Sequence, residues 1–351
     1  MGASTFVRVN GRGNAWPVFL GGSSSFYDAS SSIDLSNASF SIIHCRSNKF
    51  KLDEIESEIL IDAGHHAIPF LIQHGNRIPE AVVLTHGHLD HTLGLDWVAQ
   101  SKYYLSNKTQ LLKVYASLLV WKFVKQSYPH LEKIIDFREL LPGKQITLDG
   151  IAGIQLTAYP VYHGEHAKGA SMLCFTTNQD KQILFTGDML CPILPKKEIE
   201  KIKGAELVFI DSNNRYPYPL SNHGSVVPFS PANKTISSQL SDWFEKASLN
   251  YLIAPHARSS YNSIYHAYFE EFLDDYNAVS ELPHSIFDFA KLTLPQKLNL
   301  IHYGGMEDLK YHSASVINSE QLQEWTAKCA QDYDIKTTQF NVPGTGDVFE
   351  V

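Results

Sequence analysis

The sequence has no apolar run long enough to cross a membrane. No stretch approaches the ~18 uninterrupted apolar residues of a membrane helix. Residues 1–10 contain neither an early basic cluster nor an apolar segment, so we expect no secretory signal. These two absences favour a cytoplasmic protein with no membrane partner.

Cysteine is scarce, which argues against a disulfide framework. The four cysteines are far apart and form no CxxC pair: Cys45, Cys174, Cys191 and Cys329. Isolated cysteines of this kind are typical of free, buried thiols in a reducing compartment.

An excess of positive charge is also missing. The net charge is −8 with neutral histidines, and charged residues make up 19% of the chain. This balance disfavours a protein that grips extended nucleic acid through a basic face. A small anion held by metal ions remains compatible with it. Hydrophobic residues make up 44%, enough for a large core.

Short apolar runs recur along the chain, and several end in an aspartate or a histidine. Runs this short, rich in Val, Ile, Leu and Phe, predict buried strands. The polar residues at or just after their ends are Asp62, His86, Asp188, Asp211, His256 and His302. Ligands and catalytic groups at strand ends are the usual geometry of layered α/β proteins.

Helical patterns separate these strands, at 93–101, 109–126, 264–279 and 319–333. The alternation predicts an α/β fold, an αβ/βα four-layer sandwich with two sheets face to face and helices outside. We expect one domain over 1–351. The pattern at 109–126 is unusually apolar, so we predict a helical insert around 107–135 that acts as a lid, a homodimer face or core, with core favoured.

Four potential metal ligands lie within six residues: His86, His88, Asp90 and His91. Alternation of side chains along an extended segment puts His86 and His88 on one side, where both imidazoles can reach one ion. Asp90 and His91 follow where the chain turns into a helix, so they are better placed for a second ion. Two ions about 3.5–4 Å apart can share a water and clamp an oxyanion.

Later strand ends supply the remaining ligands. His163 suits the first ion, with His166 as a nearby competitor. Asp188 can bridge both ions, and His302 can complete the second, with His256 as its rival. A ligand set of nitrogen and oxygen without thiolate suits two divalent ions, zinc first, and admits manganese or iron.

This order of residues resembles the metallo-β-lactamase superfamily. The resemblance rests on the run from His86 to His91, followed by His163, Asp188 and His302. It implies that Asp62 orients the metal loop from behind the ligands. It also implies hydrolysis by a hydroxide bridging the two ions, with Asp90 as a candidate proton acceptor.

Within the superfamily, the chain is most similar to the phosphodiesterase branch, which includes ribonuclease Z and class II cyclic-nucleotide phosphodiesterases. Asp90 stands as a metal ligand and the set contains no cysteine ligand of the β-lactamase kind, and Gly13 begins a segment that looks like that branch's opening glycine turn. His223, in the run 222–225, lies about where the branch carries a histidine motif. This resemblance implies that His223 contacts the phosphate or protonates the leaving oxygen. The same run is also compatible with a plain polar turn.

The chain departs from ribonuclease Z because it has no flexible arm rich in glycine and proline for tRNA. Together with the acidic balance, this favours a small phosphodiester over a structured RNA. Two alternatives stay open. One is a hydrolase of a lactone, thioester or other acyl substrate that uses the same metals. The other is a non-catalytic or cofactor-biosynthesis protein that keeps the fold.

Overall fold

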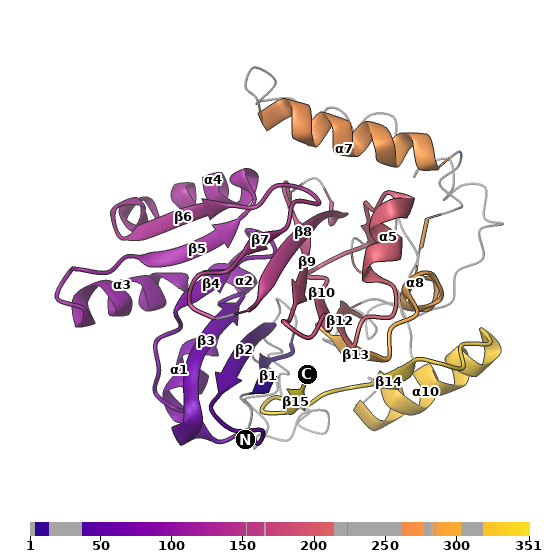
Figure 1. Cartoon of the computed structure of the whole chain (residues 1–351), viewed down its shortest axis with the longest axis horizontal. Coiled ribbons are helices and arrows are strands. Elements are labelled where there is room, and N and C mark those ends of the chain that lie inside the picture. Colours follow the sequence, from indigo (N-terminus) through magenta and orange to yellow (C-terminus); the bar gives the residue numbers. More distant parts are fainter. Residues whose placement is uncertain are drawn as a thin grey trace, which may run out of the picture.

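The computed structural model describes residues 4–13, 37–151, 153–164, 166–213, 223, 261–276, 282–283, 285–302 and 319–351. In this part of the chain two β-sheets lie face to face, and helices cover their outer faces (Figure 1). The predicted four-layer α/β sandwich is therefore confirmed. The expectation of one domain over the whole chain stays a prediction.

The first sheet contains seven strands from the N-terminal half and the C-terminal end. Its order is β15 (Val348–Glu350), β1 (Ser4–Gly11), β2 (Ser39–Cys45), β3 (Ile55–Ile61), β4 (Ala81–Val83), β5 (Leu112–Ala116) and β6 (Ile135–Glu139). Strands β3 to β6 are parallel, and the others pair antiparallel. The helical segments of this half are η2 (Leu52–Glu54), α1 (Ala67–Gln73), α2 (Leu89–Thr92), α3 (Leu95–Leu105), α4 (Leu118–Ser127) and η3 (Pro129–Lys133).

The second sheet is built from the C-terminal half. Its order is β11 (Cys191–Pro192), β8 (Gln155–Tyr162), β9 (Ser171–Thr176), β10 (Gln182–Phe185), β12 (Leu207–Asp211), β13 (Lys297–Ile301) and β14 (Gln339–Asn341), with β7 (Ile146–Thr147) also paired to β8. Strands β10, β12, β13 and β14 are parallel, so β10, β12 and β13 end at the same edge of the sheet. The helices here are α5 (Lys196–Ile202), α7 (Tyr261–Asp275), α8 (Ile286–Thr293) and α10 (Ser319–Asp332).

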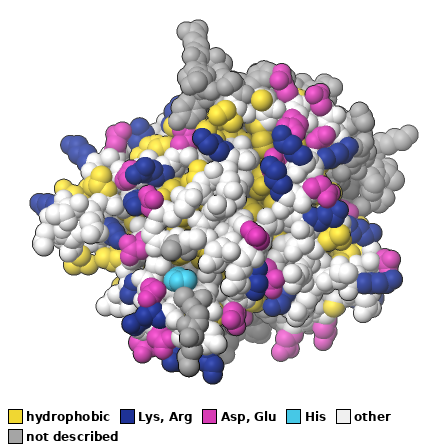
Figure 2. Space-filling view, viewed as in Figure 1, with side chains coloured by type: hydrophobic (Ala, Val, Ile, Leu, Met, Phe, Trp, Pro, Cys, Tyr) yellow, Lys and Arg dark blue, Asp and Glu magenta, His cyan; other side chains and the backbone are white. Residues whose placement is uncertain are grey.

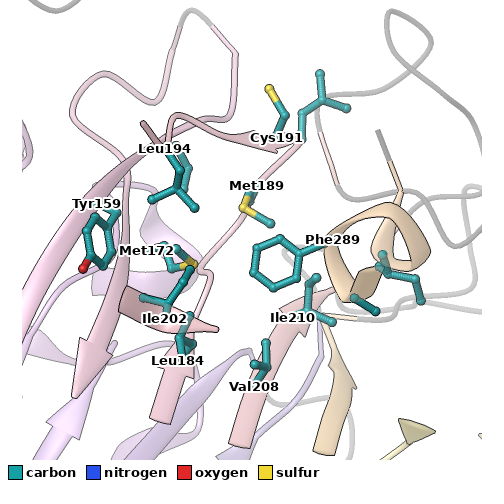
Figure 3. Close-up of a cluster of buried hydrophobic side chains, with 14 of the residues drawn as sticks. Tyr159, Met172, Leu184, Met189, Cys191, Leu194, Ile202, Val208, Ile210 and Phe289 are labelled. Carbon is teal, nitrogen blue, oxygen red and sulfur yellow. The ribbon is translucent and has the colours of Figure 1, made fainter. Parts of the chain in front are cut away.

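Alternation along strand β12 shows how the sequence makes three apolar layers. Leu207 and Phe209 belong to the cluster between the two sheets. Val208 and Ile210 point the other way and pack with helical residues such as Phe289 of α8 (Figure 3). Successive side chains of a strand face opposite sides, so a strand covered on both faces must be apolar throughout. A third cluster fills the space between the first sheet and its helices.

The predicted helix over 109–126, within a helical insert around 107–135, is present only in its second part, as helix α4 (Leu118–Ser127) and η3 (Pro129–Lys133). Strand β5 (Leu112–Ala116) occupies the first part and lies between β4 and β6. Helix α4 begins only after Ser117, whose hydroxyl accepts a hydrogen bond from the Val120 amide at 3.2 Å. A parallel strand buried on both faces is continuously apolar, so its periodicity does not distinguish it from a buried helix. Residues 112–116 are thus part of the sheet, and the helix follows them.

A buried ion pair ties together the first three strands. Arg8 is 1% exposed and Glu58 is 2% exposed, and their side chains lie 2.6 Å apart. Arg8 also donates to Asn10 Oδ1 at 2.9 Å and to the carbonyl oxygen of His74 at 3.0 Å. Burial lowers the pKa of Arg8, while Glu58 counteracts that effect. A charge buried this deeply is tolerated because every partner is in place.

We expect Glu58→Ala to lower the free energy of unfolding by roughly 3–5 kcal/mol, because Arg8 would keep its buried charge without a partner. Glu56→Ala is the matched control, since the Arg46–Glu56 pair is exposed and 3.9 Å apart. Its cost should stay below about 1 kcal/mol. Urea unfolding of both variants measures the difference, and equal losses would contradict the assigned importance of the buried pair.

Candidate metal centre

The loop after β4 carries four of the candidate ligands, and Asp62 at the end of β3 holds it in place. The Thr85 amide donates to Asp62 Oδ1 at 2.8 Å, and the Thr85 hydroxyl donates to Oδ2 at 2.6 Å. His91 Nδ1 lies 2.7 Å from the same Oδ2. The carboxylate is 1% exposed. Asp62 therefore makes the contacts expected of a residue that orients the loop.

The same hydrogen bonds fix the imidazole of His86. Its Nδ1 lies 3.1 Å from Thr85 Oγ1. The single hydroxyl hydrogen of Thr85 goes to Asp62, so Thr85 can only accept from His86. The His86 proton then sits on Nδ1, and Nε2 keeps its lone pair for an ion.

A first ligand group consists of His86, His88, His163 and Asp188, whose ligand atoms lie within 4.8 Å of one another. His163 Nε2 is 3.3 Å from His88 Nδ1 and 3.5 Å from Asp188 Oδ2. His86 Nε2 is 3.6 Å from the same oxygen. His166, the rival of His163, is exposed and outside this group. The geometry thus brings together the four residues predicted for the first ion.

A second group consists of Asp90, His91, Asp188 and His302. Asp188 Oδ1 lies 3.1 Å from His91 Nε2 and 3.3 Å from His302 Nε2. Asp90 Oδ2 lies 3.4 Å and 3.5 Å from the same two nitrogens. Asp188 therefore offers one oxygen to each group, as predicted for a shared carboxylate. His256, the rival of His302, lies outside the described residues.

The donor atoms of both groups fit divalent metal ions. Within the described residues, His86 Nε2, His91 Nε2 and Asp188 Oδ1 are buried and make no hydrogen bond of ordinary geometry, although the last two lie 3.1 Å apart. Buried polar atoms rarely remain unpaired in folded proteins, because desolvation costs about 1–3 kcal/mol for each. These atoms face one another and consist of imidazole nitrogen and carboxylate oxygen, the set that zinc prefers when thiolate is absent.

Glycines let the loops approach closely enough to form the two groups. Gly187, directly before Asp188, has a φ of +56°, and a Cβ atom there would lie 2.6 Å from Thr85 Cβ. A Cβ on Gly64 would lie 2.2 Å from the carbonyl oxygen of Asp90. A side chain at position 187 would push the loop of Asp188 away from Thr85. A side chain at position 64 would push its segment away from the backbone of Asp90.

A third group was not predicted as such: Asp188, Asp211, His223 and His302. His223 Nδ1 lies 2.9 Å from Asp211 Oδ2. Asp211 stands at the end of an apolar run, the same signal that marks Asp62 and Asp188, but the sequence pattern alone assigns no role to it. The structure therefore adds Asp211 to the site. The neighbours of His223 at 222 and 224–225, and residues 14–17 after Gly13, lie outside the described residues.

Sequence comparison decides the family. A sequence model of the beta-lactamase superfamily domain matches residues 57–246, more than half of the chain. The chain belongs to the beta-lactamase superfamily. A comparison with curated proteins found no significant match.

Solved structures agree on the metallo-β-lactamase fold. The metallo-β-lactamase fold protein YhfI from Bacillus subtilis is similar with 13% identity and a TM-score of 0.57, over 99% of this chain and 100% of that one. A diphosphatase from the PhnP family has 15% identity and a TM-score of 0.60, over 99% and 97%. Human tRNase Z, short form, has 12% identity and a TM-score of 0.50, over 98% of both chains. At such identities the likeness shows the fold alone.

Burial and neighbouring carboxylates together determine the charges of the histidines in this site. Burial lowers the pKa of His86 well below its usual value. Burial also opposes protonation of His91 and His302, but Asp188 and its neighbouring carboxylates outweigh it. The pKa of His91 is raised well above its ordinary value, and that of His302 rises to about 10. Without metal, both of these rings therefore carry a second proton, and with it a positive charge, at neutral pH.

Zinc must displace those protons, so we expect zinc binding at pH 7 to release about two protons per chain. Because protons compete with the metal, apparent affinity should rise with pH through the neutral range. Calorimetric titration in buffers of different ionisation enthalpy counts the protons. His130→Ala is a suitable control, because His130 pairs with Asp96 at the surface. Zinc binding without proton release would contradict this charge assignment.

Removal of one imidazole tests the ligand assignment itself. His88→Ala should lose metal and activity together, because His88 Nδ1 belongs to the first group. Loss of one of four ligands should weaken the first ion most and leave the second group intact. Elemental analysis after dialysis against zinc measures this, and an unchanged metal content would exclude His88 as a ligand.

Proposed function

We propose that this protein is a metal-dependent hydrolase of a small phosphodiester, with two divalent ions, zinc first, at the two groups that share Asp188. Superfamily membership indicates a hydrolase. The observation that carries the choice of substrate is His223, which lies beside both groups and is held by a buried carboxylate. A phosphodiester with an alkoxide leaving group would make use of such a histidine as a proton donor.

The chain supplies both ion sites from its own side chains. His86, His88 and His163 would hold one ion, Asp90, His91 and His302 the other, and Asp188 both. Two bound divalent ions lower the pKa of water and offset negative charge on a phosphoryl group. The remaining tasks, positioning and proton transfer, fall to residues around the ions.

Asp90 enters this proposal as a ligand and not as a base. In the metal-free chain, burial opposes its ionisation, but His91 and His302 outweigh that effect and hold its pKa far below the ordinary range. A bound divalent ion would favour the ionised form in the same way. A carboxylate that remains ionised so readily accepts a proton poorly. We therefore assign Asp90 to holding an ion.

His223 is the candidate acid for the leaving oxygen. Burial opposes its protonation, but Asp211 outweighs burial, so the pKa of His223 is raised. The ring therefore carries a proton at neutral pH more readily than a free histidine. A phosphodiester with an alkoxide leaving group needs such a proton, since alkoxides are poor leaving groups. Nitrophenolate, a stable anion, needs it much less.

Charge and surface favour a small substrate. On the face shown in Figure 2, basic and acidic side chains are interspersed, without an extended basic region. The net charge of −8 would repel a long polyanion. Two of the similar structures bear the names of a diphosphatase and a tRNase. Both names concern phosphorus chemistry, and of the two the smaller substrate agrees better with this charge.

The zinc-loaded protein should hydrolyse bis-p-nitrophenyl phosphate and at least one cyclic nucleotide. His223→Ala should keep its metal, and its turnover of the cyclic nucleotide should fall by about 10²–10⁴. Its loss with bis-p-nitrophenyl phosphate should be much smaller, because nitrophenolate leaves without a proton. Steady-state kinetics and metal analysis measure both, and His130→Ala serves as the control.

A panel of lactones, thioesters and nitrocefin completes this experiment. Turnover of acyl compounds alone would replace the phosphodiesterase proposal with the acyl alternative. Less than one bound ion and no turnover would favour the non-catalytic alternative. Unchanged turnover in His223→Ala on every substrate would remove the proton-donor role.

A further inference from the structure

Asp211 is anchored more completely than a surface carboxylate could be. It is 0% exposed at the end of β12. Its Oδ2 accepts the Met189 amide at 2.9 Å, and its Oδ1 accepts the Asn213 amide at 3.1 Å. Its own amide donates to Thr186 Oγ1 at 3.0 Å. Both carboxylate oxygens are therefore fixed in space before any imidazole is considered.

Each of these oxygens also faces an imidazole Nδ1. His223 Nδ1 is 2.9 Å from Oδ2, and His302 Nδ1 is 3.5 Å from Oδ1. The longer distance exceeds an ordinary hydrogen bond. However, His302 Nδ1 is buried and has no hydrogen-bond partner within the described chain. Asp211 is thus the acceptor positioned to take its proton.

A buried carboxylate of the first sheet pairs with the Nδ1 atom of another candidate ligand in the same way, at a shorter distance. His91 Nδ1 lies 2.7 Å from buried Asp62, while its Nε2 faces the second ligand group. Metal-binding histidines commonly donate their other ring N–H to a carboxylate, which fixes tautomer and orientation. His302 has the same arrangement, with Asp211 in place of Asp62.

We propose that Asp211 is a positioning residue that holds the imidazoles of His223 and His302 at once. The two rings are stacked, 5.1 Å apart with an interplanar angle of 22°. Since both Nδ1 atoms face one carboxylate, both Nε2 atoms point away from Asp211. For His302 that direction leads to Asp188 and Asp90. The inference rests on the proposed function for the role of His223, but not for the orientation of either ring.

An amide cannot replace this carboxylate. Among the described residues, two backbone amides and two imidazole nitrogens lie around its two oxygens. Backbone amides only donate, so both oxygens must accept. Asparagine offers one acceptor oxygen and one donor group, and that donor group would face a backbone amide on either side. Asp211→Asn therefore tests acceptance on both sides with almost no change of shape.

The test compares Asp211→Asn with Asp96→Asn, because Asp96 also pairs with a histidine but lies at the surface. In Asp211→Asn we expect zinc affinity at the second group, which contains His302, to fall by about 10–100-fold. We also expect turnover of a cyclic nucleotide relative to bis-p-nitrophenyl phosphate to fall in the same direction as in His223→Ala. Asp96→Asn should change neither quantity.

A spectroscopic measurement on the unsubstituted protein does not depend on whether the variant folds. Long-range ¹H–¹⁵N correlation spectra of the zinc-loaded chain should show a protonated Nδ1 on both His223 and His302. A proton on Nε2 and not on Nδ1 of His302, or a loss of only one of the two effects in Asp211→Asn, would overturn the double role. If no phosphodiester is turned over, the proposed function fails, while zinc affinity and ring tautomers still decide the role of Asp211.

Discussion

The candidate centre depends on how buried carboxylates are compensated. Four aspartates converge at one end of the sandwich: Asp62, Asp90, Asp188 and Asp211. Three of them are at most 2% exposed. Burying even one ionised carboxylate without a partner costs several kcal/mol. Four negative charges would be balanced by two divalent ions. In the metal-free chain the pKa values of His91, His223 and His302 are raised, so their protonated rings compensate part of the negative charge.

The two sheets bring these carboxylates together because of where their strands end. In the first sheet, β3 and β4 are parallel neighbours, and the segments that follow them carry Asp62 and the loop 85–91. In the second sheet, β10, β12 and β13 are parallel, and the segments at their ends carry Asp188, Asp211 and His302. His163 follows directly after β8. Each sheet supplies part of both ligand groups, so neither sheet could form an ion site alone.

Sequence alone was sufficient to select those candidate ligands that follow a recognisable strand. Each candidate ligand of this kind comes at or just after an apolar run. The candidates from the loop 85–91 meet Asp188 and His302 in the structure. The preference for His163 over His166 agrees with the structure, but only the fold separates the two histidines clearly, because His163 is buried and His166 is exposed. Asp211 carries the same strand-end signal as the candidate ligands. Its role does not follow from the sequence, because its contacts run across two strands and no sequence pattern records them. The apolar run of strand β5 predicts a helix in place of the strand, because burial on both faces removes the alternation that identifies a strand.

Backbone strain links the centre to the stability of the fold. Asp62 and His302 have φ values of 53° and 61°, in the left-handed region that disfavours residues with a Cβ atom. Each such residue costs on the order of 1–3 kcal/mol and persists only where its surroundings fix it. Asp62 is fixed by Thr85 and His91, and the His302 amide donates to the carbonyl oxygen of Arg12 at 2.7 Å. Binding of a metal ion to His91 and His302 would offset the free-energy cost of this strain. The same residues that would give the site its affinity for metal are thus those whose conformation the folded chain maintains at a cost.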